Sequence, residues 1–178
     1  MNSGLIARRY ATVLFDYARE RGIEDGVYED TRNIREALSV SAEAMAFVCS
    51  PVRKPSEKKR LIEQVFSQVV KAETIQFLNF VIDKDRAVML CEILRVYGVV
   101  YKEHKGIRTA VVTTAKVTES HMQERIKQLL EEKLGAVVEA SFKDDPSLIG
   151  GVIVEVDGRQ IDTSIKRQLI DIEKQLAV

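Results

Sequence analysis

The sequence has few of the residues that build metal sites, disulfides or flexible linkers. Its 178 residues include three Pro, nine Gly, two Cys, two His and no Trp. So few Pro and Gly leave no room for a low-complexity linker. The two cysteines, Cys49 and Cys91, are too few for a disulfide framework, and their apolar neighbours predict buried thiols in a reducing compartment. The two histidines, His104 and His121, lie in different predicted domains without a neighbouring His or Cys, so we expect no metal site.

An excess of one charge and long apolar runs are lacking too. Lys plus Arg and Asp plus Glu both number 27, which gives a formal net charge of zero. Affinity for nucleic acid depends largely on an excess of basic residues, so this balance argues against a dedicated nucleic-acid binder. No apolar run approaches the roughly 18 residues of a membrane span, and residues 1–9 lack the apolar core of a secretory signal. We expect a soluble, intracellular protein with no direct membrane insertion.

Helical periodicity dominates the chain up to about His104. Apolar residues recur at the 3.6-residue spacing of an α-helix in successive segments, with Gly22 as a stop signal and Pro55 as a start signal. The segments cover residues 6–17, 27–38, 41–48, 55–69, 75–82 and 90–101. Six helices joined by short connections predict a compact six-helix bundle over residues 1–105.

The pattern changes at Gly106, where β-branched residues begin. Strands are predicted at 108–114, 137–142 and 152–156, and a helical stripe between the first two ends at Gly135. Asp157-Gly158 is a strong signal for a tight turn that leads into residues 159–161. A last amphipathic helix follows, with Leu169, Ile172 and Leu176 on one stripe. Residues 106–178 therefore form a small mixed α/β domain of the α+β kind.

Motifs that carry catalysis are absent from the sequence. Neither nucleotide-binding glycine fingerprint occurs, and Gly150-Gly151 precedes a strand, which favours a structural role in backbone freedom. Asp145 with Pro146 is typical of a turn, and Asp162 stands where the N-cap of the last helix is expected. We therefore predict no catalytic residue, no cofactor and no metal.

The first helix carries two apolar stripes, although one is enough to join a core. One stripe contains Ile6, Tyr10, Val13 and Tyr17; the other contains Ala7, Ala11, Leu14, Phe15 and Ala18. Two interpretations remain open. Either the helix is central and surrounded by neighbours, or one side packs inward while the Ala-rich side receives a partner helix, since small residues allow close approach.

Several segments, in this order, resemble one family. They are 7–15 (ARRYATVLF), Ser50-Pro51-Val52 ahead of Lys58-Lys59, 77–81 (FLNFV) before Arg86, 145–151 (DPSLIGG) and 161–165 (IDTSI). Together they resemble the delta subunit of bacterial F-type ATP synthases, the counterpart of the mitochondrial oligomycin-sensitivity-conferring protein. The resemblance covers essentially the whole chain. Val13 stands where the family usually has Ala.

The resemblance implies a non-catalytic stator subunit of the peripheral stalk, on the cytoplasmic face of a bacterial cell membrane. It would link the catalytic headpiece to the membrane-anchored b subunits and resist rotor torque during proton-driven ATP synthesis. Its N-terminal domain would hold the N-terminal helix of an alpha subunit, chiefly through the first and fifth helices. Its C-terminal domain would hold the b subunits. Nucleic acid and cofactors are not among the implied partners.

These implications give residue-level hypotheses. We expect the alpha-subunit interface at Ala7, Tyr10, Ala11, Leu14, Phe77 and Val81, and the b-subunit interface at Leu169, Ile172 and Leu176. We expect a structural motif at Asp145, Pro146, Gly150, Gly151 and Asp162. The alternative is a nucleic-acid-binding regulator with a helical bundle, which the basic run from Arg53 to Arg60 supports.

Overall fold

The structure is a computed structural model, and it describes residues 3–116 and 118–169. The chain divides into two compact units, residues 1–102 and residues 103–178. The boundary predicted from the sequence lies between residues 105 and 106, close to this division. Each unit is described by itself.

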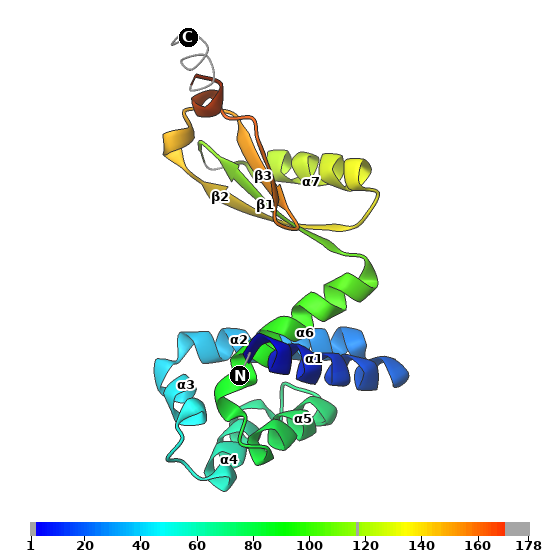
Figure 1. The fold of residues 1–178 in the computed structure, drawn as a ribbon, viewed down its shortest axis with the longest axis vertical. Helices are drawn as coiled ribbons and strands as arrows, with labels where there is room; N and C mark the ends of the chain where they lie inside the picture. The colour runs from blue at the N-terminus through cyan, green and yellow to red at the C-terminus, as the bar shows by residue number, and fades with distance from the viewer. Residues whose placement is uncertain (1–2, 117, 170–178) are drawn as a thin grey trace. The chain divides into compact units, whose positions relative to one another are not determined.

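The first unit is helical, as the periodicity predicts. Its elements are α1 (Ser3–Glu20), α2 (Glu24–Val40), α3 (Ala42–Cys49), α4 (Pro55–Phe66), α5 (Ala72–Asp83), the short 3-10 helix η1 (Ala87–Met89) and α6 (Leu90–Lys105). Local signals set several of these limits. Gly22 has φ of 65° just after α1, Pro55 occupies the first turn of α4, and Ser41 accepts a hydrogen bond from the N–H of Ala44 as the cap of α3. Figure 1 shows α3, α4 and α5 on the same side of α1 and α2.

Tyr97 of α6 lies at the centre of the helical core. Its side chain has no exposed surface, its ring centroid is 6.2 Å from that of Phe15, and its O–H donates to the carbonyl of Glu24 at 3.2 Å. Burial, followed by the negative charge of Glu24, raises the pKa of Tyr97 above its ordinary value. The phenol therefore stays protonated and keeps its hydrogen bond, which ties the start of α2 to α6.

The second unit combines a four-stranded sheet with helix α7. The strands are β1 (Arg108–Thr114), β2 (Val138–Asp144), β3 (Val152–Val156) and β4 (Arg159–Asp162), in the order β2-β1-β3-β4. β1 and β2 run parallel, joined by α7 (Ser120–Leu134), while β3 pairs antiparallel with β1 and with β4. α7 lies against one face of the sheet (Figure 1). Another 3-10 helix, η2 (Pro146–Leu148), joins β2 to β3.

The turn and strand signals of this unit are confirmed. β1 and β3 span the predicted residues. Ala110, Val112 and Thr114 of β1 are buried, while Val111 and Thr113 between them are less so, as the period of two requires. Asp157 and Gly158 have φ of 49° and 79°, and a two-residue hairpin turn of the type favoured by strand twist needs positive φ at both positions. Gly135 ends α7 in the left-handed conformation.

Candidate binding groove between helices α1 and α5

The Ala-rich stripe of α1 faces the core. Ala7, Ala11 and Ala18 have no exposed surface, and Leu14 is 1% exposed. Small side chains allow neighbouring helices to approach closely, which is how α1 fits into the centre of the unit. The hypothesis that this side receives a partner helix is therefore corrected: in the structure its surface is already covered by the chain itself.

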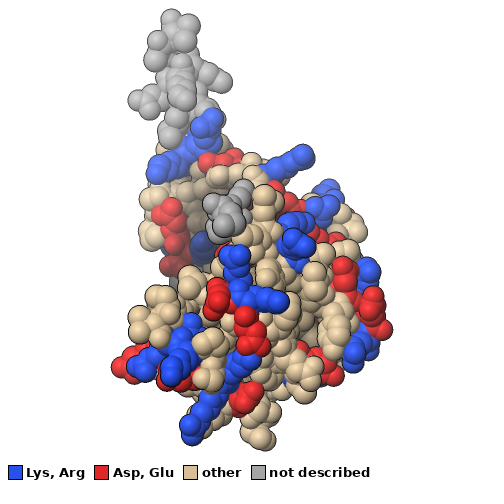
Figure 2. Space-filling view, turned by 60° about the horizontal axis from the view of Figure 1, so that its bottom comes forward, with Lys and Arg blue, Asp and Glu red and all other residues tan. Residues whose placement is uncertain are grey.

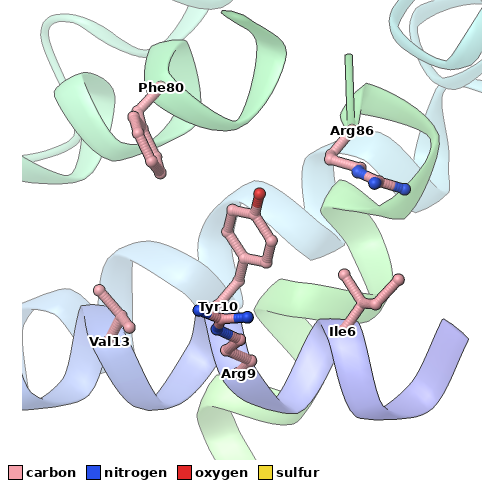
Figure 3. A pocket seen from close by; sticks show the side chains of 6 residues that line it. All are labelled: Ile6, Arg9, Tyr10, Val13, Phe80 and Arg86. Atoms are coloured by element: carbon pink, nitrogen blue, oxygen red, sulfur yellow. The ribbon is translucent and has the colours of Figure 1, made fainter. Parts of the chain in front are cut away.

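The other stripe of α1 faces outward and forms one wall of a hollow. Ile6, Tyr10 and Val13 line a cavity of about 500 Å³ with Arg9, Phe80 and Arg86. Figure 3 shows Tyr10 rising from α1 toward the space between Phe80 of α5 and Arg86 of the segment that follows α5. Val13 is 57% exposed and Phe80 is 46% exposed, which is unusual for apolar side chains of this size when they stand together.

A second hollow continues from the first along the same two helices. It is lined by Val13, Leu14 and Tyr17 of α1 and by Glu73, Gln76, Phe77 and Phe80 of α5. Val13 and Phe80 belong to both hollows, so the two form one groove, which we call the α1–α5 groove. The floor of the groove is apolar and continuous. The groove runs along α1 and α5, which belong to the same unit.

Charged side chains border the groove, and aromatic side chains contact one another within it. The ring centroids of Tyr10 and Phe80 are 6.2 Å apart at an interplanar angle of 43°, and the ammonium of Lys84 lies 5.7 Å from the Phe80 ring. Arg9 and Arg86 border the first hollow and Glu73 borders the second. An apolar floor with charged borders suits an amphipathic helix whose apolar side chains enter the groove.

The structure places the residues expected at the alpha-subunit interface in two different environments. Tyr10 and Phe77 lie on the α1–α5 groove, Leu14 reaches its floor while being 1% exposed, and Ala7, Ala11 and Val81 are wholly buried. Ile6, Val13, Gln76 and Phe80 also line the groove and are not among the expected interface residues. Ile6 and Val13 belong to the second apolar stripe of α1 and Phe80 to the segment 77–81, but nothing in the sequence says which stripe faces outward.

Asp30 is a further residue that the sequence analysis missed. Its carboxylate oxygen Oδ2 accepts hydrogen bonds from the N–H of Lys71 at 3.0 Å and from Oγ1 of Thr74 at 2.7 Å. These donors belong to the start of α5, where the cap residue Lys71 supplies no side-chain hydrogen bond of its own. Asp30, on α2, therefore caps α5 from outside and fixes the position of one wall of the groove.

The motif at residues 145–151 forms a compact turn. Oδ1 of Asp145 accepts from the N–H of Ser147 at 3.0 Å, and Pro146 occupies the first turn of η2. Gly151 has φ of 80°, and a Cβ placed there would lie 2.5 Å from the carbonyl oxygen of Thr163. A Cβ on Gly150 would lie 2.8 Å from Cδ1 of Ile165. Both glycines therefore allow the turn to pack closely against the segment after β4.

The cap of the last helix differs from the sequence prediction. Residues 165–169 are helical, and the N–H of Arg167 donates to Oγ of Ser164 at 3.2 Å, so Ser164 is the N-cap. Asp162 instead accepts from the N–H of Ser164 at 2.9 Å, two residues further along, which is a local turn. Leu169 is 52% exposed. Ile172 and Leu176 lie outside the described residues.

The basic run is largely committed to contacts within the chain. Lys58 is only 6% exposed, Lys59 pairs with Asp83 at 2.5 Å, and Arg53 lies 4.9 Å from the ring of Phe47. On the face shown in Figure 2, basic and acidic side chains are interspersed. Three of the five basic residues of the run are therefore buried or engaged within the chain.

Within residues 3–116 and 118–169, no group of three or more His, Cys, Asp and Glu side chains is placed to hold a metal ion. No helix in these ranges is long and apolar enough to cross a membrane. Cys49 and Cys91 are each half-buried and free, where the sequence analysis expected full burial.

An open apolar groove between two helices, carried by a unit that is joined to a small sheet, defines a protein that works by binding other proteins. The profile of the family described as ATP synthase delta (OSCP) subunit matches residues 6–176. The chain belongs to this family, and it is a non-catalytic component of the peripheral stalk of an ATP synthase.

Individual relatives agree with this assignment. The chain is 36% identical over 177 residues to the ATP synthase subunit delta of Desulforamulus reducens, covering 99% of this chain and 97% of the relative. It is 31% identical over 176 residues to that of Carboxydothermus hydrogenoformans, covering 99% of both. A chain in the cryo-EM structure of the Toxoplasma gondii mitochondrial ATP synthase hexamer has the same fold, with a TM-score of 0.77 at 21% identity, covering 100% of this chain and 98% of that one.

Proposed function

We propose that the α1–α5 groove holds the N-terminal helix of an alpha subunit, at the cytoplasmic face of a bacterial cell membrane. The observation that carries this proposal is the continuous apolar floor shared by the two hollows around Val13 and Phe80. A stator must resist torque through binding strength, and buried apolar area in a groove supplies it without chemistry. In this proposal Tyr10 and Phe77 keep their expected role, while Ala7, Ala11 and Val81 act as the support behind the groove.

In this proposal the helical part of the chain acts as a separate functional domain. Residues 1–105, with α1 to α6 acting as one six-helix bundle, would bind the headpiece, and residues 106–178 would bind the b subunits. The division of the chain into two compact units near residue 102 supports this arrangement. Because α6 passes through the division, it is also the element through which force would pass from one unit to the other.

A matched pair of substitutions tests the groove. Val13→Glu places a charge on its floor, whereas Val65→Glu places the same charge on α4, at a site that is 52% exposed and lines neither hollow. The N-terminal segment of the alpha subunit is titrated against the full chain by calorimetry. We expect Val13→Glu to weaken binding about 30-fold, or roughly 2 kcal/mol, and Val65→Glu to leave it unchanged. Equal affinities of the two variants would remove the groove from the interface.

For the second unit we propose that the exposed side of the last helix, at Leu169, contacts the b subunits. Leu169 and Ile165 are 52% and 43% exposed, so two apolar side chains stand at the surface within one turn. A photo-crosslinking residue at position 169 should capture a b subunit in the assembled complex. The same residue at position 159, in the exposed strand β4 at the hairpin-turn end, serves as the control. Capture from position 159 alone would contradict the proposal.

A further inference from the structure

Three sulfur atoms from two separate helical segments meet beside one cavity. The thiol of Cys91, on α6, donates to the thioether sulfur of Met45, on α3, at 3.4 Å. The thiol of Cys49, at the end of α3, donates to the same sulfur at 3.7 Å. We call these three residues the sulfur cluster. They contain all the cysteine of the chain, and they take no part in the groove described above.

The spacing of the cluster matches the coordination of a soft metal ion. Three sulfur ligands at about 2.3 Å from one ion lie about 4 Å apart in a trigonal arrangement. The distances from the Met45 sulfur to the sulfurs of Cys49 and Cys91, 3.7 and 3.4 Å, are about 0.3 and 0.6 Å shorter than this value. Two thiolates and a thioether form the kind of donor set that selects Cu(I) over harder ions, which prefer oxygen or imidazole. We propose that Met45, Cys49 and Cys91 bind one Cu(I) ion.

The cluster is open to exchange with solvent. Met45 and Cys91 line a hollow of about 620 Å³, and all three side chains of the cluster are half-buried. The other charged side chains of this hollow are Arg32, Arg35, Glu36, Glu92 and Arg95. Arg95 is paired with Glu92 at 2.8 Å, so this carboxylate already has a partner. An ion delivered by a small carrier therefore reaches two of the three sulfur atoms directly.

The binding step balances without a change in oxidation state. One Cu(I) ion and two thiols give a bis-thiolate complex of charge minus one, and two protons pass to solvent. The thioether adds a neutral donor. Arg35 lines the same hollow as Cys91, so a positive charge stands close to the negative charge of the complex. Because α3 and α6 both contribute ligands, the ion also links these two helices.

The test uses the whole 178-residue chain, reduced and without oxygen, with Cu(I) supplied as its bicinchoninate complex. We expect one ion per chain, together with thiolate-to-copper charge-transfer absorption. Cys49→Ser and Cys91→Ser should each lower the affinity by about 100-fold or more, since each removes an anionic ligand. Met45→Leu keeps the volume of the side chain and should lower it about 10-fold. The matched control is Met122→Leu, at a 47% exposed position on α7.

Particular results would overturn the proposal. Affinity unchanged by either cysteine substitution, or one ion for every two chains, rules out the site. Affinity unchanged by Met45→Leu rules out the three-sulfur donor set. Far-UV circular dichroism of each variant separates loss of the ligand from loss of the fold. A variant that fails to fold is replaced by Cys→Ala at the same position, which leaves each outcome decisive.

Discussion

Asp30 on α2 and Thr74 on α5 form a buried hydrogen bond of 2.7 Å that joins two helices far apart in the sequence. Asp30 is 6% exposed and Thr74 has no exposed surface. The same carboxylate oxygen also accepts from the N–H of Lys71, so one side chain satisfies two donors at the start of α5. This contact sets where α5, and with it one wall of the groove, lies against the core.

Replacement of Asp30 by Ala should lower the free energy of unfolding by about 2–4 kcal/mol, since the buried hydroxyl of Thr74 and the part-buried N–H of Lys71 lose their acceptor. Asp30→Asn keeps a carbonyl acceptor and should lower it by about 1 kcal/mol. Urea unfolding followed by circular dichroism measures both. The control is Asp16→Ala, which breaks only a surface ion pair with Arg19 and should cost less than about 0.5 kcal/mol. Equal losses for Asp30→Ala and Asp16→Ala would contradict the capping role.

Ala11 and Val13 should respond in opposite ways to the same substitution. Ala11→Glu buries a charge where no surface is exposed, so we expect the helical unit to unfold or to lose more than about 4 kcal/mol. Val13→Glu changes a 57% exposed site and should leave the fold intact. Thermal unfolding of the full chain distinguishes the two. A folded Ala11→Glu variant with the stability of the unmodified chain would show that this face of α1 is open.

Gly151 and Gly158 have nearly the same φ, 80° and 79°, but different surroundings. A Cβ at Gly151 meets the backbone of Thr163 and Ser164, at 2.5 and 2.9 Å, whereas nothing lies within 4 Å of one at Gly158. We expect Gly151→Ala to cost about 2–4 kcal/mol and Gly158→Ala about 1 kcal/mol, the latter from backbone conformation alone. Hydrogen exchange of the β3 and β4 amides in the full chain measures the difference. Equal acceleration in both would refute the close approach.

Acid should weaken the second unit through Asp145 and Asp162. Side-chain and then backbone hydrogen bonding from Ser147 lowers the pKa of Asp145 below its ordinary 3.8, and Ser164 does the same for Asp162. A lowered folded-state pKa stabilises the fold above the unfolded-state value. That contribution is lost as the pH falls below about 3.8 and through the folded-state values.

The matching experiment compares the chain with a variant in which Asp145 and Asp162 are both changed to Asn. Asn keeps the acceptor oxygen without the charge, so the variant should be less stable at about pH 7 and should approach the unmodified chain as the pH falls below the lowered pKa values. Urea unfolding midpoints against pH measure the two curves. A difference that stays constant with pH would exclude the charge as the cause.

Much of the second unit was predictable because its signals are local. β-branched alternation over 108–114 and 152–156 is a property of a few neighbouring residues, and so is the Asp157-Gly158 turn. The sequence predicts the N-cap of the last helix at Asp162, two residues before Ser164, which is the N-cap in the structure. Asp162 and Ser164 both accept backbone hydrogen bonds, and only the position of the first helical residue separates a local turn from an N-cap.

The groove could be predicted only in part. Both stripes of α1 are apolar, so periodicity locates the helix without saying which face the rest of the chain will cover. Of the expected interface residues, Tyr10 and Phe77 lie on the groove, while Ala11 and Val81 are buried within the chain. No local feature of the sequence indicates that Asp30 caps α5, since its partners Lys71 and Thr74 are distant in the sequence.

By itself the sequence determined the type and order of the elements, the change from helical to mixed structure near Gly106, and the family, because these depend on periodicity, turn residues and motifs along the chain. The tertiary structure alone decided which stripe of α1 stays outside, which carboxylate caps α5, and that Met45, Cys49 and Cys91 meet. Such contacts arise when helices pack, and packing depends on the fit of distant surfaces to one another.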